Sequence, residues 1–499
     1  MAAKVVSIDP RTGDEAGQVA AETPVEEVAE FCAAAAVAAP ALEALGRAGR
    51  AALLDAIAAE LEADGDRIVA LADRESALGT QRLTGELART TFQLRFMAEV
   101  IKDGAYLDAT IDHADPQAAP APRPDLRRLH VPIGPVGVFG ASNFPLAFSV
   151  PGGDTASALA AGCPVVAKAH PAHPATSQAC AEAIQRGLGG APAHTFALIY
   201  GEEAGRALVT DPHIQAVGFT GSQRGGRVLF DLAATRPDPI PFYGELGSLN
   251  PLIVTPGAAA ARADEIGRGA AQSFTLGNGQ FCTKPGLLFV PRGEPGERLI
   301  DALVDYAATA PIAPMLTAGI RSAFAAGVER AATLPDVTVI AKPDTAEAGA
   351  TVVRIPADRL TEPLLDEVFG PFIVVADYAD DEDLSAALAW LRPALTATLH
   401  AEDDEEDFTR PLVDLMLRRS GRLVWNGYPT GVAVAWAMTH GGPYPASTSA
   451  THTSVGAAAI QRWLRPVTYQ SVPQPLLPPE LRDDNPLGIP RRVDGRRES

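Results

Sequence analysis

One cysteine in the chain differs from the others in its surroundings. Cys282 lies in the segment Gly277-Asn-Gly-Gln-Phe-Cys-Thr-Lys, between glycines and directly before polar residues. Cys163 and Cys180 lie within apolar runs instead, which is typical of a buried structural thiol. We therefore interpret Cys282 as a candidate nucleophile, with a loop cysteine of no chemical role as the alternative. Cys32, Cys163 and Cys180 are interpreted as core residues.

Two isolated polar side chains could assist such a nucleophile. Glu245 lies in Phe242-Tyr-Gly-Glu-Leu-Gly, where burial would raise the pKa of its carboxyl group and make it a usable base near neutral pH. Asn143, in Gly140-Ala-Ser-Asn-Phe-Pro, is an amide inside an uncharged run and could donate to a developing oxyanion. The alternatives are a surface-loop glutamate and an asparagine that caps a turn.

A third group of residues could bind an anion. Gly218-Phe-Thr-Gly-Ser precedes a helix-like segment, and the free N–H groups at a helix N-terminus favour phosphate. The segment lacks the Gly-x-Gly-x-x-Gly fingerprint, so this motif alone is weak. Lys168 ends the apolar run Pro164-Val-Val-Ala-Lys, and its ammonium group must meet an anion or reach solvent. A nucleotide phosphate or ribose would serve.

The elements that must position these residues alternate between strands and helices. Short apolar runs begin at Val136, Pro164, Thr195 and Ala216, with helix-length segments between them, which predicts a parallel sheet covered on both faces. Ligands bind beyond the carboxyl ends of such strands, so Asn143, Lys168 and the Thr220-Gly-Ser turn are expected at one site. A second stretch of the same character runs from Asn250 to about Gly442.

The two ends of the chain have different patterns. Residues 25–110 carry apolar side chains at helical spacing and predict a helical layer. Alternating segments on both sides of the Pro-rich stretch Pro116–Pro124 predict strands in a protruding hairpin. The tail from about Arg465 is rich in proline and is interpreted as an extended arm, packed on the body or on a neighbouring subunit.

Composition excludes several classes of protein. The 499 residues include 41 Lys plus Arg and 61 Asp plus Glu, so the net charge of −20 disfavours binding to nucleic acids and to anionic membranes. Four cysteines without paired spacing argue against a disulfide framework and a zinc site, and no metal is expected. The run from Val131 to Gly153 contains too many prolines and glycines for a membrane helix. The first residues of the chain show no secretory signal, so the expected location is the cytoplasm.

The segments that contain Asn143, Lys168, the Gly218-Phe-Thr-Gly-Ser turn, Glu245 and Cys282 occur in this order and are followed by Glu367-Val-Phe-Gly-Pro. This series of motifs resembles that of the aldehyde dehydrogenase superfamily over nearly the whole chain. The resemblance implies an α/β fold with a Rossmann-like cofactor domain, a related α/β catalytic domain and a small β-hairpin module for oligomerisation. The implied parts are residues 1–108 (helical part of the cofactor domain), 109–130 (oligomerisation hairpin), 131–245 (Rossmann-like cofactor domain), 246–445 (catalytic domain) and 446–499 (C-terminal return and oligomerisation arm).

The resemblance also implies roles for individual residues. Cys282 would be the nucleophile, Asn143 an oxyanion donor together with the Cys282 backbone N–H, and Glu245 the general base. The implied cofactor-binding residues are Lys168 at the adenosine ribose, Ser222 at the pyrophosphate and Glu367 at the nicotinamide ribose, together with His170, Gly221 and Phe369. The expected product is a carboxylate, formed through a thiohemiacetal and a thioester.

Finer motifs, among them His440-Gly-Gly-Pro-Tyr-Pro and Lys168-Ala-His-Pro, resemble the bacterial 2-oxoglutarate semialdehyde (2,5-dioxovalerate) dehydrogenases. Arg89, with Gln93 one turn on, is the candidate partner of the distal carboxylate; a surface arginine paired with Glu86 is the alternative. Phe92 and the stretch 433–437 depart from the expected pattern. The alternatives are therefore a dehydrogenase of longer or less polar aldehydes, and a catalytically silent relative that binds nucleotide.

The cofactor is expected to be NADP, with NAD as the alternative. NAD-preferring relatives usually carry a glutamate where this chain has Pro171, and Lys168 and His170 could attract a 2′-phosphate. The other expected partners are a small aldehyde and further copies of the chain, in a homodimer or homotetramer.

Overall fold

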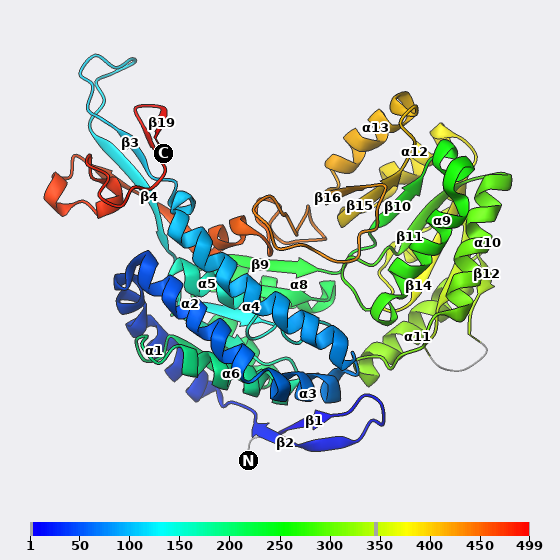
Figure 1. Cartoon of the computed structure of the whole chain (residues 1–499), viewed down its shortest axis with the longest axis horizontal. Coiled ribbons are helices and arrows are strands. Elements are labelled where there is room, and N and C mark those ends of the chain that lie inside the picture. The colour runs from blue at the N-terminus through cyan, green and yellow to red at the C-terminus, as the bar shows by residue number, and fades with distance from the viewer. Residues whose placement is uncertain (1–2, 344–347, 499) are drawn as a thin grey trace.

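The computed structural model describes residues 3–343 and 348–498. Figure 1 shows two α/β bodies side by side, with a small sheet that projects from the first body. The N-terminal strands β1 (Lys4–Ile8) and β2 (Glu15–Ala21) form an antiparallel hairpin beneath the first body. The last residues of the chain return to the small sheet, which therefore contains strands from both an early and the final part of the sequence.

The predicted helical layer is confirmed. It consists of α1 (Val25–Ala44), α2 (Gly46–Ala63), α3 (Gly65–Ser76) and α4 (Thr80–Asp103). Leu54, Ile57 and Leu61 of α2 are spaced three and four residues apart and are fully buried, as one apolar helix face requires. Leu83 and Leu94 of α4 belong to the same core.

The first parallel sheet contains the predicted strands. Its order is β7 (Phe196–Ile199), β6 (Val165–Lys168), β5 (Val136–Phe139), β8 (Ala216–Gly221) and β9 (Phe242–Leu246). The connecting helices are α5 (Gly153–Ala161), α6 (Pro174–Gly187), α7 (Glu202–Thr210) and α8 (Gln223–Ala234). The strand order reverses between β5 and β8, so the crevice for a ligand opens at their carboxyl ends.

The second sheet is parallel except for one edge pair. Its order is β12 (Thr338–Ala341), β13 (Thr351–Pro356), β14 (Phe372–Tyr378), β11 (Leu287–Pro291), β10 (Pro251–Val254), β15 (Ala394–His400) and β16 (Ser420–Trp425). Its helices are α9 (Pro256–Thr275), α10 (Glu294–Thr309), α11 (Ala318–Ala332), α12 (Asp381–Trp390) and α13 (Glu406–Leu417). Leu252 and Ile253 enter different cores on opposite faces, which explains the continuous apolar strand sequences.

The third sheet joins the predicted hairpin to the C-terminal tail. Its order is β17 (Leu464–Gln470), β4 (Leu126–Pro132), β3 (Thr110–Asp112), β18 (Arg491–Val493) and β19 (Arg496–Glu498). The tail is extended, as predicted, but it also adds strands on both sides of the β3–β4 pair. The Pro-rich composition concealed these strands because proline argues against a strand except at a sheet edge, which is where β17, with Pro466, lies.

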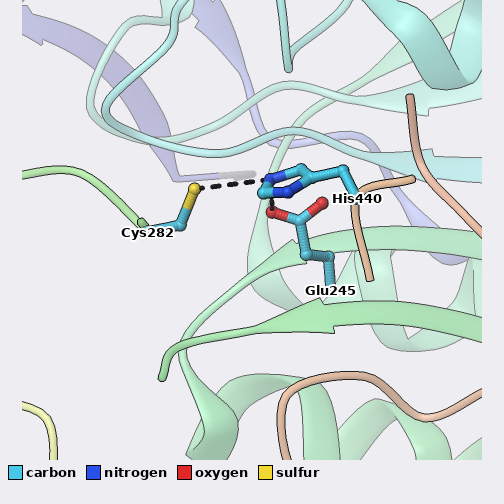
Figure 2. A group of neighbouring side chains, drawn as sticks. All are labelled: Glu245, Cys282 and His440. Atoms are coloured by element: carbon cyan, nitrogen blue, oxygen red, sulfur yellow. Dashed lines mark hydrogen bonds and ion pairs between the residues drawn. The ribbon is translucent and has the colours of Figure 1, made fainter. Parts of the chain in front are cut away.

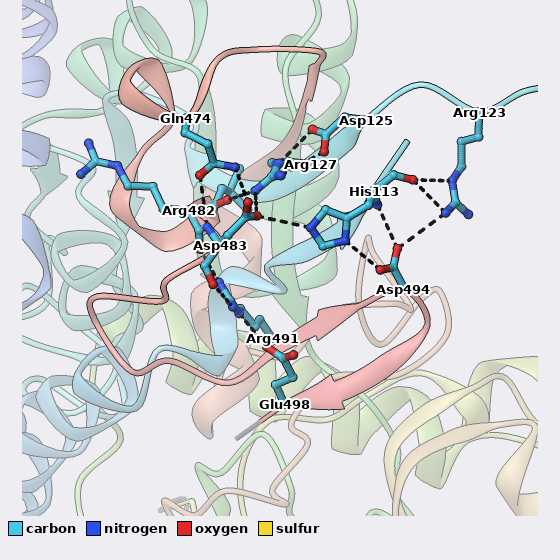
Figure 3. Close-up of polar contacts among 11 residues, drawn as sticks. His113, Arg123, Asp125, Arg127, Gln474, Arg482, Asp483, Arg491, Asp494 and Glu498 are labelled. Carbon is cyan, nitrogen blue, oxygen red and sulfur yellow. Dashed lines mark hydrogen bonds and ion pairs between the residues drawn. The ribbon is translucent and has the colours of Figure 1, made fainter. Parts of the chain in front are cut away.

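A network of charged side chains fixes this tail, as Figure 3 shows. The Arg127 guanidinium, almost fully buried, donates to the Leu481 carbonyl at 2.7 Å and to Asp483 Oδ1 at 2.6 Å. His113 Nδ1 lies 2.7 Å from Asp494 Oδ2. Both contacts join the hairpin to residues more than 350 positions later in the chain.

All four cysteines are free thiols, and Cys32, Cys163 and Cys180 are buried, as predicted. In the described part of the chain, no single helix is long and apolar enough to cross a membrane; only the bent pair α1–α2 passes such a test together. The uncharged run from Val131 to Gly153 forms β5 and turns, as expected. Short 3₁₀ helices complete the fold: η1 (Ala105–Leu107), η2 (Leu276–Gly279), η3 (Ala357–Arg359), η4 (Glu362–Leu365), η5 (Ala457–Trp463), η6 (Gln474–Leu476) and η7 (Pro479–Leu481).

Candidate active site

Cys282 lies in a tightly held loop between η2 and β11. Gly277, Asn278 and Gly279 have left-handed backbones, and a Cβ on Gly279 would lie 2.2 Å from the Gly370 backbone. The Asn250 amide donates to the Cys282 carbonyl at 2.7 Å and to the Lys284 carbonyl at 3.0 Å. The loop that carries the thiol is therefore fixed by its turns and by a buried side chain.

Three reactive side chains meet at this loop (Figure 2). His440 Nε2 lies 3.7 Å from Cys282 Sγ and 2.9 Å from Glu245 Oε1, and the three reactive atoms lie within 4.8 Å of one another. Glu245 belongs to the end of β9, and its other oxygen accepts a hydrogen bond from the Ser454 hydroxyl. The imidazole therefore stands between a thiol and a carboxylate, an arrangement that can move a proton off the thiol.

Sequence reasoning missed His440 and Ser454. The signal available was the segment His440-Gly-Gly-Pro, which contributed to the resemblance without a role. His440 is fully buried. Its backbone N–H donates to Thr453 Oγ1 at 2.7 Å, and its backbone carbonyl accepts a hydrogen bond from the Ser454 backbone N–H at 2.9 Å. These contacts place the imidazole beside β9, about two hundred residues away in sequence.

The expectation that burial raises the pKa of Glu245 is wrong. Burial does act upward, but the charge of His440 and the hydrogen bonds from His440, Ser454 and Cys282 together hold the pKa of this carboxyl below its usual value. Burial, followed by the negative charges of Glu245 and Glu367, raises the pKa of the Cys282 thiol well above its usual value. The resting pair is thus a neutral thiol and an ionised carboxylate.

Asn143 lies in the loop after β5 and lines the same cleft as Cys282. Its Nδ2 donates to the Gln280 carbonyl at 2.9 Å. An amide nitrogen carries two hydrogens, so one remains for an oxyanion. The contact to Gln280, two residues before Cys282, ties the predicted oxyanion donor to the loop of the nucleophile.

One face of α4 clamps the Asn143 loop. Arg82 donates to the Asn143 carbonyl at 2.8 Å, and Glu86 Oε1 accepts the N–H groups of Leu146 and Ala147 at 2.8 and 3.0 Å. These residues are one helical turn apart, and Arg89 and Gln93 continue the same face. Glu86 is buried, which raises the pKa of its carboxyl group.

Arg89 does not pair with Glu86 among the described residues. Its guanidinium donates to Gln93 Oε1 at 2.8 Å and to the Val432 carbonyl at 2.9 Å, and it lies over the Phe148 ring at 5.1 Å. Arg422, which sequence reasoning missed, donates to the Pro429 and Gly431 carbonyls. Two half-buried arginines therefore hold the 429–432 loop by its carbonyl groups.

A cleft of about 450 Å³ brings the predicted cofactor residues other than Lys168 together with Cys282 and Glu245. Its lining includes Asn143, His170, Pro171, Gly221, Ser222, Glu245, Cys282, Glu367 and Phe369. Ser222 caps α8, whose first turn has no acidic residue, so its free N–H groups suit an anion. A Cβ on Gly247 would lie 1.8 Å from Glu367 Oε2, so only glycine leaves room for that carboxylate. These features fit a nucleotide cofactor.

The two cations expected near a 2′-phosphate differ in charge. Burial, followed by the charges of His173 and Lys168, lowers the pKa of His170 well below its usual value, so this imidazole is neutral and cannot attract phosphate by charge. That part of the sequence interpretation is wrong. Lys168 remains the cation, and burial lowers its pKa while Glu202 and Glu22 oppose this.

A second buried lysine supports Glu367. The Lys284 ammonium donates to the Val368 carbonyl at 3.2 Å and to the Phe372 carbonyl at 2.7 Å. Burial lowers the pKa of Lys284 and raises that of Glu367, and the opposite charges of the two groups moderate both effects. Lys284 thus fixes the 367–372 segment against the loop of Cys282.

Comparison with known proteins gives consistent matches. Residues 2–325 match the family model described as "Aldehyde dehydrogenase family". The chain is 48% identical over 461 residues to alpha-ketoglutaric semialdehyde dehydrogenase 2 of Azospirillum brasilense, covering 90% of this chain and 88% of that protein. It is 43% identical to alpha-ketoglutaric semialdehyde dehydrogenase of Acinetobacter baylyi, covering 89% and 86%. A putative aldehyde dehydrogenase from Burkholderia cenocepacia has a similar fold, with a TM-score of 0.81 at 21% identity over 96% of both chains.

The contacts of Glu86 predict different outcomes for two substitutions. Glu86→Ala removes the acceptor of two buried N–H groups and should lower the free energy of unfolding by about 2 to 4 kcal/mol, with a fall in kcat because the Asn143 loop shifts. Glu86→Gln keeps an oxygen acceptor and should cost less than about 1 kcal/mol. Urea unfolding and steady-state assays measure both. Equal losses in the two variants would contradict the clamp.

Proposed function

This chain belongs to the aldehyde dehydrogenase family and is an NAD(P)-dependent aldehyde dehydrogenase, and we propose that it oxidises 2-oxoglutarate semialdehyde to 2-oxoglutarate with NADP. The observation that carries the proposal is the cluster of Cys282, His440 and Glu245, two of which, Cys282 and Glu245, line a nucleotide-sized cleft. A catalytically silent relative would have no need to keep a thiol, an imidazole and a carboxylate in contact in its interior.

The first step is attack of the Cys282 sulfur on the aldehyde carbon. Because the pKa of the thiol is raised, a base must take its proton. His440 Nε2, 3.7 Å from the sulfur, takes this proton as it passes its own to Glu245 Oε1 at 2.9 Å, so the proton ends on the carboxylate. The Asn143 amide and the Cys282 N–H stabilise the oxyanion of the thiohemiacetal.

Collapse of the thiohemiacetal expels a hydride and leaves a thioester on Cys282. The nicotinamide cofactor supplies the hydride acceptor, and Gly221, Ser222, Glu367 and Phe369 would hold it in the cleft. Glu245 then takes a proton from the attacking water, with His440 as its neighbour, and the carboxylate product leaves.

Cys282→Ser tests the reaction class. The variant should lose at least about a thousandfold in kcat, because a neutral hydroxyl is a poor nucleophile, while nucleotide binding stays nearly unchanged. Glu245→Gln should still form one equivalent of reduced cofactor in a burst and then stall before hydrolysis. Stopped-flow absorbance of NADPH measures both. Substantial turnover by Cys282→Ser, or uniform slowing of Glu245→Gln without a burst, would refute these roles.

The substrate assignment rests on positive charge near the nucleophile. Arg89 and Arg422 are both half-buried and both bond to the 429–432 loop; burial lowers the pKa of each guanidinium, and the charge that Cys282 carries as a thiolate opposes this. A distal carboxylate in a dry tunnel needs such a cation. One feature favours less polar aldehydes instead. The rings of Phe92 and Trp436 are 52% and 55% exposed, and both pack against the ring of Phe96, so together they form an aromatic surface.

Arg89→Ala separates the two substrate classes. The variant should raise KM about ten- to hundredfold for acidic semialdehydes and much less for uncharged aldehydes, since only the former lose a charged hydrogen bond. Arg95→Ala is the matched control, because Arg95 lies on the same helix but pairs with Glu62 at the surface. Equal effects of Arg89→Ala on both substrate classes would discard the role.

The NADP preference rests on the turn after β6. Pro171 lines the cleft at the position where NAD-preferring relatives carry a glutamate, so no carboxylate repels a 2′-phosphate there. Lys168 supplies the positive charge. Glu22 and Glu202 act on the same lysine and reduce its attraction, so the preference depends on Pro171 more than on net charge.

Pro171→Glu should shift kcat/KM toward NAD by weakening NADP binding, since like charges repel at short range. Pro171→Ala is the control that removes the ring without adding charge. Initial rates with each cofactor at equal concentrations measure the ratio. More efficient use of NAD by the unaltered protein would contradict this interpretation.

We also propose the five parts outlined from sequence as the functional divisions, with the first sheet binding the cofactor and the second carrying catalysis. The third sheet would join copies of the chain in a homodimer or homotetramer. Its position at the periphery and its two edge strands, β17 and β19, support this assignment.

A further inference from the structure

A small polar cavity lies beside Glu245. Its volume is about 20 Å³, which is enough for one water molecule. Tyr243, His440, Ser449, His452, Ser454 and Arg462 are among its lining residues. Glu245 lines both this cavity and the cleft that contains Cys282, so it is the residue that the two spaces share.

The proposed reaction needs an exit for protons. One aldehyde and one water yield a carboxylate, a hydride and two protons: one proton comes from the thiol as the sulfur–carbon bond forms, and one from the water as the thioester is cleaved. Cofactor and substrate would occupy the cleft during the first step. The small cavity gives Glu245 a second side by which a proton can leave.

We propose that Ser454 and His452 relay these protons from Glu245 to solvent through a water molecule in the small cavity. This inference rests on the proposed function. It adds residues that touch neither substrate nor cofactor and act only through Glu245.

The inner end of the relay is the Ser454 hydroxyl. It donates to Glu245 Oε2, while Glu245 Oε1 faces His440. One carboxylate oxygen thus faces the imidazole beside the nucleophile, and the other bonds to Ser454, which lines the cavity. A hydroxyl both donates and accepts, so Ser454 can pass a proton outward and take another from the carboxyl group.

The outer end is His452. Its Nδ1 lies 2.8 Å from Ser449 Oγ and 3.0 Å from Thr451 Oγ1, and its ring packs 4.9 Å from the Tyr243 ring. His452 is half-buried, and Thr451 beside it is exposed. The imidazole therefore connects the cavity to a solvent-exposed turn.

The charges around His452 favour release of the proton. Arg462, the charged group that lines the cavity beside Glu245, is held by Asp154 at 2.6 Å. Burial, followed by the charge of Arg462, lowers the pKa of His452. A proton that arrives at this imidazole is thus passed to solvent instead of being retained.

His452→Gln tests the relay, because glutamine can keep a hydrogen bond to Ser449 but cannot titrate. Acylation should be unaffected, so the burst of reduced cofactor keeps its amplitude, while steady-state kcat falls about tenfold or more. Added imidazole, at constant pH and ionic strength, should restore kcat in a saturable manner. His213→Gln, at a surface histidine beside Asp211, is the matched control.

Two outcomes would overturn the relay: a kcat equal to that of the unaltered protein at every buffer concentration, or a lowered kcat that imidazole does not restore. Ser454 gives an independent test. Ser454→Ala should slow hydrolysis of the thioester and move the acidic limb of the kcat profile to higher pH, and Ser454→Thr should restore both. The assays use any aldehyde that the unaltered protein oxidises, so failure of the semialdehyde assignment and failure of the relay are separate results.

Discussion

A carboxylate and an imidazole in contact within the protein interior constrain the rest of the active site. The side chains of Glu245 and His440 are 4% and 0% exposed, and an isolated charge at such depth would cost several kcal/mol. The pair is tolerable because the imidazole and the carboxylate lie 2.9 Å apart and Ser454 donates to the other carboxylate oxygen. The backbone follows: Leu246 N–H bonds to the Ala446 carbonyl at 2.9 Å, and Thr448 N–H bonds to the Gly244 carbonyl at 3.0 Å, so the 446–448 segment runs beside β9.

The other loops of the site are held by the same device, a buried polar side chain that bonds to backbone. Glu86 holds the N–H groups of the Asn143 loop, Asn250 holds the carbonyls around Cys282, and Lys284 holds the segment of Glu367. Each would be costly without its partners, so each loop has one favoured position. The reacting groups are thereby placed before substrate arrives, which lowers the reorganisation needed in the transition state.

The local charge of the site opposes the charge of the whole protein. The chain carries −20 overall, yet Arg89 and Arg422 lie near Cys282, and in the described part of the chain neither forms an ion pair with a carboxylate. Their guanidinium groups bond instead to carbonyls of the 429–432 loop, which leaves both arginines without a direct carboxylate partner. A negatively charged protein with two such arginines near its nucleophile disfavours polyanions and suits a small acidic aldehyde.

The sequence by itself determined the helices and strands of the first α/β body and the identity of several cleft residues. Apolar periodicity sufficed for the helical layer and for β5 to β8, because buried strands and helix faces leave a local pattern. Cys282, Glu245 and Asn143 were identifiable because an isolated polar group among glycines and apolar residues is costly to bury unless it has a structural or chemical role. Tertiary structure alone decided which groups meet. His440 and Ser454 join Glu245 across about two hundred residues, and their contact reverses the direction in which the pKa of Glu245 shifts. The neutral His170 and the strands of the C-terminal tail were equally invisible, since burial and strand pairing depend on distant segments that no local pattern records.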